Sequence, residues 1–239
     1  MKNLKKLPII ISILSLFTFF LPANADIKVV ASIKPIHSLA SYLMNGVAKP
    51  DLIVDGYASP HGCAMKPSHA KMLQNADLIF WVGEDLESFL EKPLGSIAKK
   101  AEKIKLMQVK GLQILKFRER NIFDDHDDHG HDDHGKKEDD HDDHGHDDHE
   151  GHAHGEFDPH IWLDPINAKV ILNEMVEHLI ENDEKNASIY KSNLDKALKD
   201  IDKLISDVKS ELNKEISFIV FHDAYQYFEE RFNVNILGR

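Results

Sequence analysis

A run of histidine and acidic residues interrupts this chain, and it limits what the chain can fold into. Between Asp124 and His154 the sequence reads DDHDDHGHDDHGKKEDDHDDHGHDDHEGHAH, with no large apolar side chain. Such a segment cannot bury enough apolar surface to offset the entropy lost on ordering, so we predict that it is disordered. Any folded structure must therefore form from the segments on either side of it.

The same run predicts metal binding. Neutral imidazole is a preferred ligand of zinc, copper and nickel, and histidine-rich tracts commonly bind metals. A solvated acidic linker is the alternative, but acidity alone does not account for a histidine at every second or third position. The run holds ten of the sixteen histidines of the chain: His126, His129, His131, His134, His141, His144, His146, His149, His152 and His154.

The N-terminus predicts export. A basic MKNLKK precedes the apolar run LPIIISILSLFTFFL and the small-residue sequence PANA, the pattern of a secretory signal peptide, here cut after Ala25. A retained membrane anchor is the alternative, but the run is shorter than the ~20 residues that a spanning helix needs. No cysteine stands at the cleavage site, so we expect a soluble periplasmic protein without a lipid anchor. The single cysteine, Cys63, excludes an intramolecular disulfide.

The negative charge belongs to the histidine-rich run. The chain has a formal net charge of −12, and the run alone, with fourteen acidic residues and two lysines, also carries −12. The rest of the mature chain is near −3, because three lysines leave with the signal peptide. No basic patch stands out, so we expect no nucleic-acid partner.

The flanking segments predict an α/β fold with parallel sheets. Short apolar, β-branched runs alternate with helical patterns, which is typical of parallel β/α units. In such sheets ligands bind at the loops beyond the carboxyl ends of the strands. The predicted strands are 27–33, 51–57, 76–83, 104–109, 217–221 and the start of one within 233–238; the longer predicted helices are 165–181 and 186–214.

Three histidines outside the run follow predicted strands or precede a predicted helix. His61 comes after the strand at 51–57, His160 lies in FDPHIWLDP, and His222 ends the strand at 217–221. Three imidazoles from separate loops suit a zinc site whose fourth position is taken by water or a carboxylate, whereas manganese favours more carboxylate oxygen. Each histidine alone could equally be a packing or capping residue. His69 and His178 look like ordinary surface positions, and His37 like a packing or capping residue.

Five segments resemble one known family. SIKPIHSLA, SPHGCAMKPSHAKMLQNADLIFWVG, the histidine-rich insertion, DPHIWLDPINA and VFHDAYQYFEERF occur here in this order. Together they resemble the zinc-binding periplasmic receptors of bacterial ABC importers, the ZnuA type, over about residues 27–239. The resemblance implies two α/β lobes joined by one long helix, with the metal between them. It also implies that His61 and His160 of the first lobe and His222 of the second bind the ion.

The resemblance also implies a division of the chain. We expect a signal peptide at 1–25, an N-terminal lobe at 26–123 with a return segment at 155–164, and the metal-binding loop at 124–154. A connecting helix at 165–185 and the start of a C-terminal lobe at 186–239 follow, so we expect that the second lobe is incomplete in this chain.

The sequence departs from the family pattern at the first ligand. Some members have a carboxylate where this chain has Pro60, and many have an aromatic residue where it has Cys63. Others take an acidic fourth ligand from near the end of the second lobe, so the fourth ligand stays open here. Cys63 is a further candidate ligand, although free cysteine is usually a small buried residue. Asp223 either orients an imidazole or caps the helix that starts there.

These observations predict a receptor and not an enzyme. We expect a monomer that captures Zn²⁺ and delivers it to the membrane permease of an ABC transporter. The same scaffold tuned to manganese or iron, and a periplasmic zinc buffer without a permease, are the alternatives. A secreted zinc hydrolase is disfavoured, because the helix signature H-E-x-x-H is absent and no paired nucleophile and base stands out.

Overall fold

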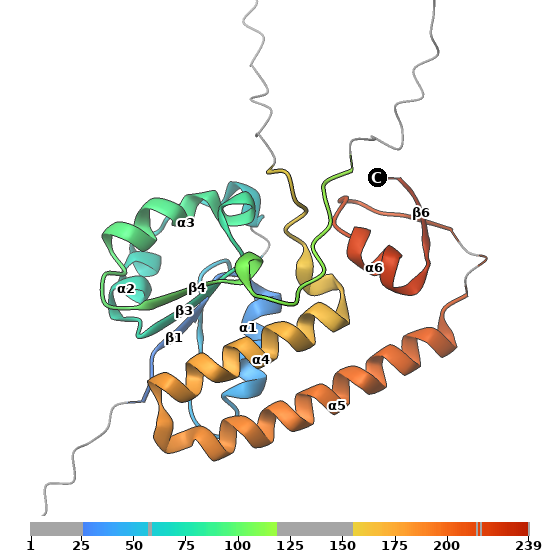
Figure 1. The fold of residues 1–239 in the computed structure, drawn as a ribbon. Coiled ribbons are helices and arrows are strands. Elements are labelled where there is room, and N and C mark those ends of the chain that lie inside the picture. The colour runs from blue at the N-terminus through green and yellow to red at the C-terminus, as the bar shows by residue number, and fades with distance from the viewer. Residues whose placement is uncertain (1–25, 57–58, 119–154, 214, 216, 239) are drawn as a thin grey trace, which may run out of the picture.

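The fold was analysed in a computed structural model, which describes residues 26–56, 59–118, 155–213, 215 and 217–238. The predicted signal peptide and the histidine-rich run lie outside these residues. Within them, two α/β lobes flank a pair of long helices (Figure 1).

The first lobe is built on a sheet of four parallel strands in the order β2-β1-β3-β4. All residues of β1 and β3 are buried, as expected for parallel strands that are covered on both faces. The strands are β1 (Val29–Ala31), β2 (Asp51–Leu52), β3 (Leu78–Trp81) and β4 (Glu102–Lys105).

Helices connect these strands, and proline sets the start of two of them. Pro35 and Pro67 occupy the first turns of their helices, where a missing backbone N–H costs no hydrogen bond. The elements are α1 (Lys34–Leu43), α2 (Pro67–Asn75) and α3 (Glu84–Ser96), with short 3₁₀ helices η1 (Pro60–Gly62) and η2 (Leu106–Gln108).

A helical hairpin leads from the first lobe to the second. After the 3₁₀ helix η3 (Ile161–Leu163), α4 (Pro165–Asn182) packs against α1 and β3, and α5 (Ala187–Glu211) runs back along α4 and α1 (Figure 1). The turn between them is η4 (Glu184–Asn186). The buried carboxylate of Asp183 fixes this turn, because it accepts hydrogen bonds from Tyr190 at 2.7 Å and from Asn186 at 2.7 Å.

The second lobe has a two-stranded parallel sheet of β5 (Ser217–Ile219) and β6 (Asn235–Gly238), connected by α6 (Gln226–Phe232). Figure 1 shows α6 beside the start of α4 and near the last described residues before the histidine-rich run. The second lobe therefore meets the first at the edge where the sequence places the candidate ligands.

The predicted fold class is confirmed: the chain is mixed α/β, with parallel sheets and a long helix. The predicted strand 104–109 is misplaced, because pairing with β3 ends at Lys105 and Leu106–Gln108 turns into a 3₁₀ helix. The predicted helix at 186–214 contributes only partly to the core: Tyr190 and Ala197 are buried, but Leu204 is 53% exposed. The domain boundaries stay a prediction. No helix in the described ranges has the length and apolarity needed to cross a membrane.

Candidate metal centre

His61 lies on a short turn after the second strand of the sheet. It is the middle residue of η1, and the Ser59 hydroxyl at the N-cap accepts a hydrogen bond from the His61 backbone N–H at 3.3 Å. Pro60, at the first position of η1, suits the start of a helical turn because its fixed φ is already helical. The local sequence SPHG therefore holds His61 on a short helical turn at the edge of the first lobe.

His160 is buried between an aspartate and a tryptophan. Its exposed fraction is 4%, and Asp158 at 2% is buried with it. The Asp158 Oδ1 atom lies 3.0 Å from the His160 backbone N and 2.6 Å from Nδ1. An ionised carboxylate can only accept, so Nδ1 carries the proton and Nε2 presents its lone pair. The Trp162 ring packs edge-on at a centroid distance of 5.4 Å, which leaves the His160 ring held in one orientation.

His222 brings the second lobe to the same place. It follows β5 closely, and its Nε2 atom lies 3.3 Å from the Nε2 atom of His160. In a tetrahedral zinc site with Zn–N bonds of about 2.0–2.1 Å, neighbouring nitrogens lie about 3.3–3.4 Å apart. The observed spacing therefore fits two imidazoles that share one ion.

The three histidines form one cluster. Their ring centroids are 5.2 to 5.7 Å apart, and one ligand atom from each lies within 4.8 Å of the others. They line a cavity of about 550 Å³ whose wall includes Trp162 and the fully exposed Phe221. The structure thus brings together all three candidates from outside the histidine-rich run. The ten candidates at 126–154 lie outside the described residues.

Two further candidates occupy other positions. The Cys63 sulfur lies 3.7 Å from the Ala64 carbonyl, in range of a weak S–H hydrogen bond, and Cys63 is not a member of the histidine cluster. Asp223 lies 3.1 Å from the Arg118 guanidinium. The idea that Asp223 caps the following helix is wrong, because α6 begins at Gln226 with Tyr225 at its N-cap.

A buried tyrosine of α6 joins the two lobes next to His160. The Tyr227 hydroxyl donates to the Asp158 carbonyl at 2.7 Å and accepts from the Leu115 backbone N–H at 3.1 Å. Burial raises the pKa of Tyr227 to about 12, so the hydroxyl stays a donor. Sequence reasoning missed both this tyrosine and Asp158. The D-x-H spacing was a readable signal for Asp158, but nothing in the sequence pairs Tyr227 with a segment sixty-nine residues away.

Ion pairs reinforce this contact between the lobes. Arg231 of α6 donates to both carboxylate oxygens of buried Asp164, at 2.6 and 2.7 Å, and this contact raises the pKa of Arg231. Arg118, the last described residue before the histidine-rich run, contacts Glu229. Charge-assisted, bidentate pairs of this kind fix geometry as well as add energy, so α6 and His222 keep a defined position relative to His160.

Histidines away from the cluster have local roles. The expectation that His69 is an ordinary surface residue is wrong: it is 6% exposed, and its Nδ1 accepts from the Lys66 backbone N–H at 3.3 Å. Burial, followed by the charge of Lys66, lowers the pKa of His69. The Nε2 atom of His37 is 3.0 Å from the Pro50 carbonyl, which fits the predicted packing role.

The fold and the site together define a class: an α/β protein of two parallel-sheet lobes with a three-histidine candidate metal centre where the lobes meet. Comparison with known families narrows this class. The chain belongs to the ZnuA family, described as zinc-uptake complex component A, periplasmic, whose pattern matches residues 29–239.

Curated relatives carry the same family name. The high-affinity zinc uptake system protein ZnuA of Brucella abortus (strain 2308) is 42% identical over 249 aligned positions, which cover all of this chain and 74% of that protein. The ZnuA protein of Yersinia pestis is 32% identical over 223 positions, covering 90% of this chain and 65% of that protein. This chain therefore spans about three-quarters of the length of its Brucella relative.

Solved structures share the fold. A deletion mutant of ZnuA crystallised with zinc has a TM-score of 0.67 at 20% identity, covering 89% of this chain and 69% of that one. The Zn(II)-bound ZnuA-like domain of Streptococcus pneumoniae AdcA has a TM-score of 0.64 at 16% identity, covering 90% and 67%. At these identities the likeness supports the fold alone.

Proposed function

We propose that this protein is a zinc receptor: it captures Zn²⁺ in the periplasm and delivers it to the membrane permease of an ABC importer. One observation carries the proposal. His61, His160 and His222 come from three separate segments, yet one ligand atom from each lies within 4.8 Å of the others. We assign these three as the zinc ligands, with the fourth position open to water or a carboxylate.

The donor set favours zinc over manganese or iron. Three imidazoles suit a borderline-soft ion, whereas manganese prefers carboxylate and water oxygen. The Asp158 carboxylate bonds to Nδ1 of His160, whereas Nε2 of the same ring faces His222. Asp158 therefore acts by orienting its imidazole and strengthening it as a ligand. The names of the relatives, which are zinc uptake proteins, support the same metal.

The histidine-rich run 124–154 would collect zinc for this site. The segments on either side of it lie together, because Lys116 and Phe157 form an antiparallel bridge and the Asp158 N–H donates to the Leu115 carbonyl at 2.9 Å. His160 is six residues from His154, a span of at most about 20 Å for an extended chain. A tether this short raises the local concentration of loop-bound zinc at the site.

The remaining parts of the proposal concern location, assembly and chemistry. The signal peptide is cut after Ala25, the mature receptor works as a monomer in the periplasm, and it has neither catalytic activity nor a nucleic-acid partner. The periplasmic description of the family supports this location.

A competitive metal titration tests the site. The background is the chain with residues 124–154 removed, so that the loop histidines do not bind the added metal. We expect one tight zinc ion bound by the three-histidine site, displaced poorly by manganese, and loss of that ion in His160→Ala and His222→Ala. His37→Ala, which removes an imidazole outside the cluster, is the matched control. A preference for manganese, or unchanged zinc binding in both cluster variants, would contradict the assignment.

Delivery needs a separate experiment. Pull-down of the membrane permease with the full-length receptor distinguishes a transport receptor from a periplasmic zinc buffer, because a buffer binds zinc but no permease. Cells that express the chain without residues 124–154 should take up less zinc when zinc is limiting. Unchanged uptake would rule out the collecting role of the loop while leaving the three-histidine site intact.

A further inference from the structure

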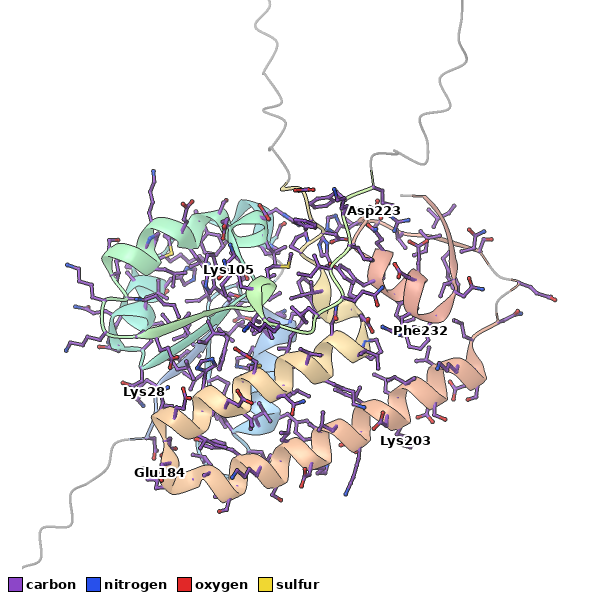
Figure 2. All side chains as sticks on the ribbon, in the orientation of Figure 1. Lys28, Lys105, Glu184, Lys203, Asp223 and Phe232 are labelled. Carbon is purple, nitrogen blue, oxygen red and sulfur yellow. The ribbon has the colours of Figure 1, made fainter. Side chains whose placement is uncertain are left out.

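A second group of ligand side chains lies at the far end of α4. His178, near the end of this helix, faces Glu102 at the first residue of β4 and Glu181 one turn further along α4. One ligand atom from each of the three lies within 4.8 Å of the others. His178 is fourteen residues from Asp164, about 20 Å along the helix. Figure 2 shows this separation, with Glu184 just past α4 at one end of the molecule and Asp223, beside His222, at the other.

The hydrogen bonds of His178 leave one ring nitrogen facing two carboxylates. Nε2 lies 3.3 Å from Glu174 Oε1 in hydrogen-bond geometry, and a carboxylate only accepts, so Nε2 carries a proton. Nδ1 of the neutral ring then presents a lone pair. Glu102 Oε1 lies 2.8 Å from this atom and Glu181 Oε2 lies 3.5 Å from it. A lone pair so close to two anionic oxygens is repulsive unless a cation lies between them.

Nδ1 of His178 has two carboxylate neighbours and no partner in hydrogen-bond geometry. Nδ1 is buried and makes no hydrogen bond, because the Glu102 oxygen, although close, lies outside the direction in which an N–H would donate. A single N–H also points in one direction, whereas two oxygens approach Nδ1. A metal ion can take the nitrogen and both oxygens as ligands at once.

The negative charge around His178 also favours a bound cation. In the described part of the chain, neither Glu102, Glu174 nor Glu181 pairs with a lysine or arginine. The second oxygen of Glu102 is held by the Asn182 side-chain amide at 2.7 Å, which also donates to the His178 carbonyl at 2.9 Å. Glu102 is therefore oriented, while its other oxygen stays directed toward Nδ1. The Glu181 side chain is 68% exposed, which gives an ion a route from solvent.

We propose that Glu102, His178 and Glu181 form a second divalent-metal site, which binds Zn²⁺ through one imidazole nitrogen and two carboxylate oxygens. A fourth position remains for water, as in other open three-ligand zinc sites. The ion joins the start of β4 to the end of α4. Its ligands come from β4 of the first lobe and from α4, and none from the second lobe, so it fills independently of the three-histidine centre.

Histidine NMR on the full-length chain tests the site without interference from the other imidazoles. The ring nitrogens are labelled with ¹⁵N, the His178 signals are identified by their absence in His178→Gln, and zinc is titrated. We expect Nδ1 of His178 to move to a metal-bound chemical shift while Nε2 keeps its proton. The proposal is wrong if His178 does not respond at zinc concentrations that saturate His160, or if its Nδ1 shows only the signature of a protonated ring.

Variants test the carboxylate ligands. The double variant Glu102→Gln, Glu181→Gln should raise the zinc concentration needed at His178 by at least about tenfold, the lower range of losses seen when a metal site loses even an outer partner. Glu177→Gln removes the same kind of charge from an exposed position on the same helix and should leave His178 unchanged. His160 should titrate alike in all variants. An equal response of His178 in the double variant would overturn the assignment of both ligands.

Discussion

Asp158 should set the zinc affinity of the three-histidine centre although it is not assigned as a ligand. Its Oδ1 atom accepts from both the backbone N–H and the Nδ1–H of His160, at 3.0 and 2.6 Å, and both residues are buried. Asp158→Asn keeps an oxygen that accepts these bonds but removes the negative charge behind the ring. Asp158→Ala removes the charge and the orientation of the ring together.

The expected losses follow from these contacts. Removing an outer partner of a metal-bound histidine costs 10- to 100-fold in affinity. We expect Asp158→Asn to weaken zinc binding about tenfold, or about 1.4 kcal/mol, and Asp158→Ala about a hundredfold, or about 2.7 kcal/mol. The ranking of the two variants is a stronger test than either affinity loss, because only Asp158→Ala frees the His160 ring to turn.

The assay is competition for zinc with a fluorescent chelator, in the background that lacks residues 124–154. Circular dichroism shows whether each variant is folded, since the alanine variant leaves the buried His160 N–H without an acceptor. Asp195→Asn, at an exposed position on α5, makes the same charge change as a control. If Asp158→Ala binds zinc as tightly as the parent, the reasoning about His160 is refuted.

Three further predictions concern stability, each measured by urea unfolding. Burial raises the pKa of Glu87 to about 7, although the Gly83 and Val82 N–H groups donate to it. The pKa of Glu87 is about 4.5 in the unfolded chain and about 7 in the fold. The protonated carboxyl therefore contributes stability that is fully present below pH 4.5 and is lost as the pH rises through 7. Glu87→Gln, which cannot ionise, should avoid up to about 3 kcal/mol of that loss; an identical pH profile in the variant and the parent would contradict it. Arg231→Met leaves Asp164, 2% exposed, without its bidentate partner and should cost about 3–5 kcal/mol, whereas Asp164→Asn in the same variant should recover part of it. Leu172→Ala in the core of α4 should cost about 2–5 kcal/mol, and Leu204→Ala, 53% exposed on α5, no more than about 0.5; similar costs for the two leucines would show that this burial pattern is wrong.

The sequence by itself determined the order of elements and the ligand candidates. Alternating apolar runs and helical patterns predicted the parallel α/β lobes, because burial on both faces makes a strand such as Leu78–Trp81 continuously apolar. Position at the ends of strands pointed to His61 and His222, since carboxyl ends of parallel strands share one edge, and the segment FDPHIWLDP before a predicted helix pointed to His160. The end of β4 at Lys105 could not be predicted from the sequence, because it is set by pairing with β3 and not by local composition.

Only the tertiary structure decided what each candidate touches. His69 and His178 look alike in the sequence, yet one is buried at the start of α2 and the other faces Glu102 from seventy-six residues away. Tyr227 and Asp158 meet for the same reason, through the docking of α6 beside η3. Sequence periodicity records which side of an element is apolar, but contacts between distant segments depend on how the elements pack. The orientation of the imidazoles in the histidine cluster therefore follows from the packing of the two lobes.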